Sequence, residues 1–234
     1  MSNPECVTVL QKNLDRIRQR IRSACERCNR NEYDVELVAV TKYAAWPWVK
    51  SLAALHGCLG ESRPQQLMER APQLPDAEWH MIGSLQSNKV RQVVRAAAVI
   101  HSVDSLKLLE RVARIAAEED TDVRVLLQVN VSGETSKSGF DPHNLLESWD
   151  QIPELLSTAV HVVGLMTMAP ATEDPEATRP IFTGLAQLRK ELIEQSPEIS
   201  LPHLSMGMSR DFEVAIEEGA TLIRVGSALF ESLN

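Results

Sequence analysis

Lys42 is the residue whose position most directly predicts a chemistry. It follows the run 36–41, Glu-Leu-Val-Ala-Val-Thr, which is apolar over most of its length. A lysine at the mouth of a buried strand is held partly out of water, which favours the neutral amine. A neutral amine can attack a carbonyl carbon and form a Schiff base. We therefore take Lys42 as a candidate nucleophile for a carbonyl compound.

Two Ser/Gly-rich turns far downstream could bind a phosphate. They are residues 205–209, Ser-Met-Gly-Met-Ser, and Gly226-Ser227. Backbone N–H groups and hydroxyls in such turns can surround an anion, and Gly207 would let the ligand approach the backbone closely. Ser209 is predicted to be the N-cap of a helix whose free N–H groups attract an anion, although an ordinary capped helix would look the same. With Lys42, these turns suggest an aldehyde that carries a phosphate.

Composition indicates a globular chain and narrows the function classes. The chain has 234 residues, 44% of them hydrophobic, and a formal charge of −8, which argues against non-specific nucleic-acid binding. We find neither an apolar run long enough to span a membrane nor a signal peptide, so we expect a cytoplasmic protein. The pair Cys25 and Cys28 lacks a second pair, so we expect no metal site.

Apolar strand-like runs alternate with helix-like segments, and no Gly/Ser-rich linker separates them. Amphipathic helices are predicted at 5–28, 105–119 and 179–195. We expect a single domain over 1–234, with a leading helix within 1–30 that covers the barrel or its bottom, and a barrel over 35–230. The predicted strands are 36–40, 57–60, 79–82, 99–103, 123–129, 160–166, 203–206 and 222–225.

Eight such alternations with short turns are typical of an α/β fold of the (β/α)8 TIM-barrel type. The alternative is a doubly wound open sheet, but its G-x-G-x-x-G fingerprint does not follow the first strand. In a TIM barrel the carboxyl ends of the strands carry the functional residues. Polar turns also end strands that have no function, and this reading stays open. The residues expected at this rim are Lys42, Glu61, Ser62, 83–89, Asp104, Asn130, Met166, 206–209 and Gly226-Ser227.

Arg224 lies inside the last predicted strand. By alternation Leu222, Arg224 and Gly226 share one face of that strand, and Ile223 and Val225 share the other. A charged side chain in an apolar strand is costly unless it is paired, so we expect it to point into the barrel mouth. Its partner would be a carboxylate such as that of Glu61, or a ligand atom.

The sequence resembles the pyridoxal phosphate homeostasis protein family from about Val35 to Phe230. Each matching motif falls at a different predicted strand end, in the order expected for the family, so the combination is highly specific. The motifs are Ala39-Val-Thr-Lys42, Gly60-Glu61, 79–89 (WHMIGSLQSNK), Gln128-Val-Asn130 with Ser136-Lys-Ser-Gly139, Gly164-Leu-Met166, 204–209 (LSMGMS) and 223–230 (IRVGSALF).

The resemblance implies the barrel of the alanine-racemase-like class of pyridoxal phosphate proteins, fold-type III. Lys42 would hold the cofactor as a Schiff base, and Arg224 would face the pyridine nitrogen. A guanidinium there keeps that nitrogen unprotonated and weakens the electron sink, which points to a poor catalyst. His80 and Met166 would neighbour the ring, with Asn130 nearby, although His80 could equally be a satisfied core residue. The phosphate would be held by Ser205, Gly207, Ser209, Gly226 and Ser227.

The function implied by the resemblance is a non-catalytic, monomeric carrier that keeps free pyridoxal phosphate low and delivers it to apo-enzymes. Two alternatives use the same lysine. One is an amino-acid racemase, which in relatives needs a second domain for which the barrel leaves no residues. The other is a Schiff-base aldolase acting on a sugar phosphate without a cofactor. The sequence departs from the family at 60–63, where Gly-Glu-Ser-Arg replaces the usual Gly-Glu-Asn-Tyr.

Overall fold

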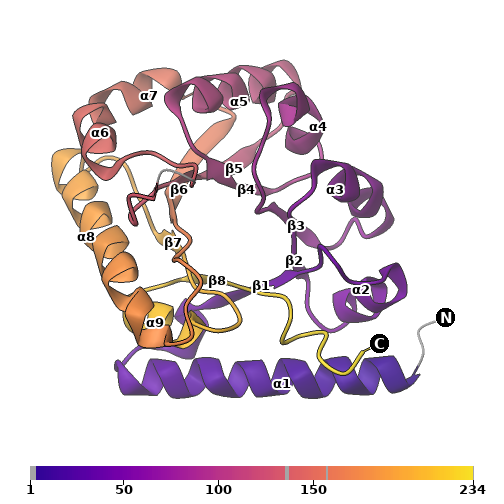
Figure 1. The fold of residues 1–234 in the computed structure, drawn as a ribbon. Helices are drawn as coiled ribbons and strands as arrows, with labels where there is room; N and C mark the ends of the chain where they lie inside the picture. Colours follow the sequence, from indigo (N-terminus) through magenta and orange to yellow (C-terminus); the bar gives the residue numbers. More distant parts are fainter. Residues whose placement is uncertain (1–3, 135–136, 157, 234) are drawn as a thin grey trace.

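The computed structural model describes residues 4–134, 137–156 and 158–233, and its eight parallel strands close into a barrel (Figure 1). The strands pair in sequence order, and the last pairs with the first, which confirms the predicted (β/α)8 fold. The strands are β1 (Glu36–Val40), β2 (Cys58–Glu61), β3 (Glu78–Met81), β4 (Val99–Val103), β5 (Val123–Gln128), β6 (Val160–Met166), β7 (His203–Ser205) and β8 (Leu222–Val225).

The strand boundaries differ from the predicted ones by at most one residue at each end. The predictions 36–40, 99–103, 160–166 and 222–225 are confirmed without change. The predicted strand 123–129 ends one residue earlier, because Val129 makes only an isolated bridge to Phe140. Hydrogen bonding, rather than hydrophobicity, determines where each ladder stops.

In the part of the chain that the structure describes, a helical connection follows each strand except β8. In α5, the Ser105 hydroxyl accepts a hydrogen bond from the Leu108 N–H, so this helix begins where its amphipathic pattern predicts. The α-helices are α1 (Pro4–Arg27), α2 (Trp46–Ala53), α3 (Pro64–Arg70), α4 (Val90–Val94), α5 (Leu106–Glu118), α6 (Pro142–Glu147), α7 (Ile152–Leu155), α8 (Arg179–Gln195) and α9 (Phe212–Glu217). Short 3-10 helices are η1 (Glu32–Asp34), η2 (Ala71–Gln73), η3 (Ser87–Lys89), η4 (Trp149–Gln151) and η5 (Pro175–Thr178).

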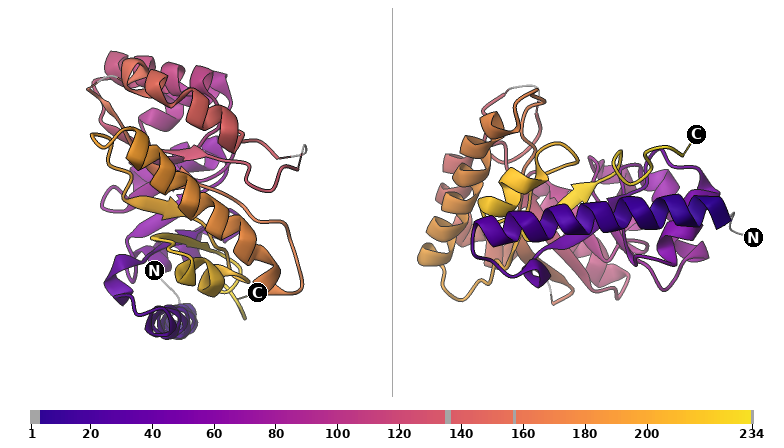
Figure 2. Two further views of the ribbon diagram at one scale, coloured as in Figure 1. Left: turned by 90° about the vertical axis from the view of Figure 1, so that its left-hand side faces the viewer. Right: turned by 90° about the horizontal axis from the view of Figure 1, so that it is seen from below.

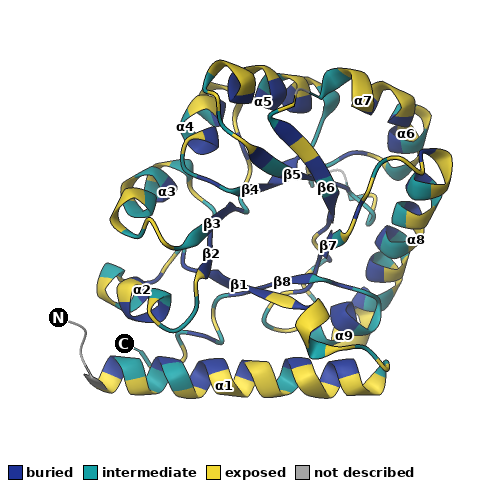
Figure 3. Ribbon diagram, turned by 180° about the vertical axis from the view of Figure 1, so that it is seen from behind, coloured by how far each residue is buried: buried dark blue, intermediate teal, exposed yellow. Residues whose placement is uncertain are grey.

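The strands separate two hydrophobic layers, and Figure 3 shows the ring of strands almost entirely buried. The larger layer lies between the barrel and its helices and includes Ile223 and Val225. The smaller layer fills the barrel interior and includes Leu222, so the alternation predicted for β8 is confirmed. The interior residues are Val38, Cys58, Val99, Leu126, Met166 and Leu222.

Helix α1 lies against the side of the barrel, between α2 and α9, and not across its bottom (Figures 1 and 2). Its apolar stripe, which includes Leu10, Leu14 and Ile17, is buried in the outer layer. No helix follows β8 in the described residues, so α1 fills that place in the ring. The Asn13 amide donates to the carbonyl oxygens of Leu229 and Glu231, at 3.0 and 2.9 Å, and so ties α1 to the segment after β8.

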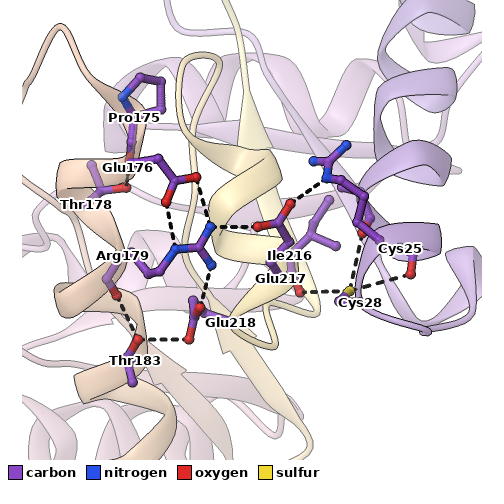
Figure 4. Close-up of polar contacts among 12 residues, drawn as sticks. Cys25, Cys28, Pro175, Glu176, Thr178, Arg179, Thr183, Ile216, Glu217 and Glu218 are labelled. Atoms are coloured by element: carbon purple, nitrogen blue, oxygen red, sulfur yellow. Dashed lines mark hydrogen bonds and ion pairs between the residues drawn. The ribbon is translucent and has the colours of Figure 1, made fainter.

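Ion pairs hold α9 between α8 and α1 (Figure 4). The Arg179 guanidinium contacts Glu176 at 2.7 Å, Glu217 at 2.7 Å and Glu218 at 2.6 Å, and Glu217 also pairs with Arg27 of α1. Nearby, the Cys28 thiol donates to backbone carbonyls, so this cysteine takes part in packing α1 against α9.

Two features are absent from the residues that the structure describes. None of their helices is long and apolar enough to cross a bilayer. None of their His, Cys, Asp and Glu side chains gather in a group of three or more that could hold a metal ion.

Candidate functional site

Lys42 lies at the carboxyl end of β1, on the same face of the barrel as the Ser/Gly turns that follow β7 and β8. All strands run in parallel, so their carboxyl ends meet at one rim. Lys42 is half-buried, and its Nζ lies 5.1 Å from the ring centroid of exposed Tyr43. The lysine and both turns therefore share the rim that the sequence predicts.

A buried ion pair holds the backbone on both sides of Lys42. Arg70 Nη1 lies 2.5 Å from Glu61 Oε1, and this carboxylate also accepts from the Thr41 hydroxyl at 2.7 Å. The same guanidinium donates to the carbonyls of Thr41 and Ala44, at 2.9 and 3.0 Å. Arg70 thus fixes the chain just before and just after the lysine.

Arg224 is buried in the barrel and does not pair with Glu61. The prediction that Glu61 could be its partner is therefore wrong. Its guanidinium donates to the Ser205 hydroxyl at 2.5 Å and to the Thr167 carbonyl at 2.9 Å. Glu61 is occupied by Arg70 instead. Burial lowers the pKa of Arg224 to about 10, so the group stays charged at neutral pH.

The turns after β7 and β8 leave several backbone donors unused. Among the described residues, the hydrogen bonds outside helices and strands leave the N–H groups of Gly207, Ser209, Gly226 and Ser227 without an acceptor. Gly207 has φ = +92°, and a Cβ there would lie 2.6 Å from the Ala215 Cβ. Only glycine fits this position, and the unused donors suit an anion.

Ser209 is not the N-cap of α9, which corrects the sequence prediction. The helix begins at Phe212 with Asp211 in the cap position, and Asp211 Oδ1 accepts from the Met208 N–H at 2.6 Å. This carboxylate closes a turn before the helix, and burial raises its pKa. The helix has six residues, so the unused donors of the turn, and not a helix terminus, form the candidate anion site.

Ser205 and His80 lie in the barrel interior and contact a residue that sequence reasoning missed, His101 of β4. His101 Nδ1 lies 2.8 Å from Ser205 Oγ, and its Nε2 lies 2.9 Å from His80 Nδ1. Strand alternation could have placed His101 inside, because it shares a face with the interior residue Val99. The structure thus gives both Ser205 and His80 buried hydrogen-bond partners in the barrel interior.

Asn130 and Met166 lie at the rim and in the interior, respectively. The Asn130 amide donates to the carbonyls of Glu134 and Lys137, at 2.9 and 3.2 Å, and so holds the loop after β5. Met166 is buried in the interior layer at the end of β6. Ser136, in a motif used for the resemblance, lies outside the described residues.

Comparison with known proteins decides the family. The profile of the alanine racemase N-terminal domain matches residues 12–233. A pyridoxal phosphate homeostasis protein of Aquifex aeolicus is 41% identical over 225 residues, which cover 94% of this chain and 96% of that protein. The chain belongs to the pyridoxal phosphate homeostasis protein family.

Solved structures agree with membership of the pyridoxal phosphate homeostasis protein family. PipY of Synechococcus elongatus PCC7942, solved with pyridoxal phosphate bound, is 38% identical with a TM-score of 0.77, over 84% of this chain and 92% of PipY. Alanine racemase of Clostridium difficile 630 has a TM-score of 0.71 at 18% identity, over 94% of this chain and 56% of the racemase. The second likeness shows that the two proteins share the barrel fold.

The departure from the family pattern at 60–63 lies at the rim beside Lys42. Arg63 occupies the place of the usual tyrosine, and its Cζ lies 5.7 Å from the ring centroid of Tyr43. Lys42 approaches the same ring. Two cations therefore lie over the Tyr43 ring, and Arg63 itself is exposed.

Proposed function

We propose that this chain binds pyridoxal phosphate as a Schiff base on Lys42 and acts in intracellular pyridoxal phosphate homeostasis without substantial catalytic turnover. The observation that carries the proposal is the combination of Lys42, the buried Arg224 and the unused N–H groups of the two turns at one rim. The names of the relatives and the ligand in the PipY structure support the same ligand here.

The residues present fit each part of such a ligand. A phosphate needs several donors, and the N–H groups of Gly207, Ser209, Gly226 and Ser227 supply them without losing a bond inside the protein. The aldehyde needs an amine, and Lys42 is held at the rim by the Arg70 contacts. When bound, the cofactor supplies a carbonyl carbon and an electron-withdrawing ring.

Arg224 supports a carrier rather than an enzyme. Its pKa of about 10 keeps the guanidinium charged at neutral pH, and a guanidinium has donors but no acceptor. Facing the pyridine nitrogen, it would donate to that nitrogen and keep it unprotonated. An unprotonated ring withdraws electrons weakly, so we propose that amino-acid chemistry on this protein is slow.

We propose direct ligand contacts for Lys42, Arg224 and the four turn residues, and indirect roles for the other predicted site residues. Ser205 would support Arg224, because its hydroxyl is bound to Arg224 and His101. His80 would act indirectly, through its hydrogen bond to His101 in the barrel interior. Met166 would shape the interior behind the ring, and Asn130 would hold the β5 loop near the mouth.

A spectrum of the purified protein with added pyridoxal phosphate tests the central claim. We expect a visible band that borohydride bleaches and that Lys42→Ala lacks. Lys50→Ala, which removes an exposed lysine of α2, is the matched control and should keep the band. A band of equal strength in Lys42→Ala would rule out Lys42 as the attachment site.

Turnover separates the proposed carrier from a racemase or an aldolase. We expect racemisation of alanine or serine no faster than with free pyridoxal phosphate. Sustained racemisation well above that rate would show an enzyme instead. Borohydride trapping of a sugar phosphate on Lys42 in cofactor-free protein would favour an aldolase.

We also propose a cytoplasmic monomer that passes its ligand to apo-enzymes. Cys6, Cys25, Cys28 and Cys58 are free thiols, as expected in a reducing compartment. Sedimentation of the purified protein tests the monomer. Mixing ligand-loaded protein with an apo-enzyme, and measuring how fast activity returns compared with free ligand at the same concentration, tests delivery.

A further inference from the structure

A continuous line of hydrogen bonds runs through the barrel interior from one end toward the other. It starts at Glu78, the first residue of β3, whose Oε1 lies 2.9 Å from His80 Nε2. His80 continues to His101 and His101 to Ser205, at 2.9 and 2.8 Å. Ser205 accepts from Arg224 at 2.5 Å. Side chains of four different strands, β3, β4, β7 and β8, therefore form one chain.

The middle of this chain is closed to solvent, and its first residue is not. His80, His101 and Ser205 are each at most 1% exposed, whereas the Glu78 side chain is 40% exposed and also pairs with Arg124 at 3.1 Å. A buried polar group without a partner is costly, so each ring nitrogen and the hydroxyl must use the contacts described. The amino-terminal face of the barrel is thus connected to the guanidinium at the site.

The chemistry of the two ends fixes the direction of every proton between them. Arg224 can only donate, so Ser205 Oγ accepts from it. The buried hydroxyl hydrogen also needs an acceptor, and His101 Nδ1 is the other group that Ser205 Oγ contacts, so the hydrogen points there. His101 then carries its proton on Nε2 and donates to His80 Nδ1. His80 in turn carries its proton on Nε2 and donates to Glu78, which as a carboxylate can only accept. The requirements from both ends agree.

Neighbouring groups favour the same protonation states. Burial, helped by the nearby charge of Arg224, holds the pKa of His101 well below its usual range, so this ring is neutral. The hydrogen bond from His80 lowers the pKa of Glu78 to about 2, so the carboxylate is ionised. Burial raises the pKa of the Cys58 thiol, which lies 3.6 Å from His80 Nε2 and so brings no second negative charge.

We infer that Glu78, His80 and His101 are positioning residues, which fix the Ser205 hydroxyl and through it the guanidinium of Arg224. Two nitrogens of Arg224 are each held by one acceptor, Ser205 Oγ and the Thr167 carbonyl. Turning the Ser205 hydroxyl away from His101 would require the proton on each histidine to move to its other nitrogen. That this line of hydrogen bonds matters for a ligand rests on the proposed function. The arrangement of protons along the line does not.

Nitrogen-15 NMR of the ligand-free protein, labelled at histidine, tests the arrangement at neutral pH. We expect His80 and His101 to be neutral, with protonated Nε2 and unprotonated Nδ1. His101→Gln and His80→Gln assign the two rings, and exposed His143 serves as a reference for a solvated ring. An imidazolium, or a proton on Nδ1 of either residue, would overturn the inference whether or not the protein binds pyridoxal phosphate.

Ligand affinity tests whether this arrangement positions Arg224. We expect Ser205→Ala and His101→Leu to weaken pyridoxal phosphate binding about tenfold, as expected for losing one hydrogen bond to a charged group. Ser205→Thr, which keeps the hydroxyl, should bind more tightly than Ser205→Ala. Val99→Ala is the matched control, because it removes volume from the same face of β4 without touching the chain.

The variants separate positioning from general damage to the interior. If His101→Leu does not fold, Ser205→Ala carries the test with the smaller change. Wild-type affinity in Ser205→Ala would overturn the inference, as would an equal loss in Val99→Ala. Failure of the wild-type protein to bind pyridoxal phosphate would reject the proposed function instead, while the NMR result would still stand on its own.

Discussion

Arg70 Nη1 lies 2.5 Å from Glu61 Oε1, in an ion pair that is mostly closed to solvent and fixes the backbone around Lys42. Removing one partner of a buried pair leaves the other charge unpaired. We therefore expect Arg70→Ala to lower the free energy of unfolding by about 3–5 kcal/mol, measured by urea denaturation. Arg63→Ala, at an exposed arginine next to α3, should change it by less than about 0.5 kcal/mol. Equal losses of unfolding free energy in Arg70→Ala and Arg63→Ala would show that the Arg70–Glu61 pair does not stabilise the fold.

Gly207→Ala should damage both stability and ligand binding. The added methyl group would lie 2.6 Å from the Ala215 Cβ and 2.8 Å from the Phe212 Cα, at φ = +92°. We expect a loss of about 1–3 kcal/mol in unfolding free energy from overpacking, and strain at this φ adds to it. Gly57→Ala is the control, because no atom lies within 4 Å of a Cβ placed there. Calorimetry and a pyridoxal phosphate titration would measure the two effects.

Stability should fall as the pH drops below about 6.5. The pKa of buried His101 is well below its usual value. Below pH 6.5 His101 therefore binds a proton in the unfolded chain but not in the native state. Because the unfolded state binds more protons, the unfolding free energy rises with pH, by up to about 1.4 kcal/mol per pH unit for this one group. Burial also lowers the pKa values of His56 and His203, which act in the same direction.

Urea unfolding at pH 7.5, 6.5 and 5.5 measures this dependence. His101→Gln should reduce the slope between pH 6.5 and 5.5, whereas His143→Gln, at an exposed histidine, should leave it unchanged. An identical slope in wild type and His101→Gln would show that His101 is not held neutral in the native state.

Asn13→Ala should release the segment after β8. Asn13 is buried and donates to the carbonyls of Leu229 and Glu231. Its removal leaves these acceptors without a donor, which costs about 1–3 kcal/mol. Hydrogen exchange should become faster over 226–233, and Gln11→Ala, on the exposed side of the same helix, should leave it unchanged. Unaltered exchange in Asn13→Ala would show that other contacts hold this segment.

The sequence predicts the barrel well because its signal is local. Each strand is a short apolar run between amphipathic segments, so β1, β4, β6 and β8 are found with their observed ends. The position of α1 is not local. Its apolar stripe shows that one face is buried. That this face packs beside β8, after which the described residues form no helix, is seen only in the closed barrel.

The residues of the candidate site also fall into two groups, those that the local sequence predicts and those that depend on distant segments. Lys42 and Gly207 could be predicted, because a strand end and a glycine turn can be read from neighbouring residues. The N-cap at Ser209 was wrong because the Asp211 carboxylate, three residues from Met208, closes the turn first. His101 was missed because its partners lie on β3 and β7, which approach it only when the barrel is closed.

The position of α1 beside β8 affects the order in which the parts of the barrel can fold. Helix α1 packs against α9 and is tied to the segment after β8, which is synthesised much later, and β1 lacks its second neighbour until β8 has been made. The apolar stripe of α1 stays uncovered until α9 and the segment after β8 have been made, so we expect ring closure to be a late step in folding. In Figure 1 the two termini also lie at the same corner of the molecule. A short linker joining them, with new ends opened in an exposed loop, should therefore give a circular permutant that still folds, and loss of its cooperative unfolding would contradict this expectation.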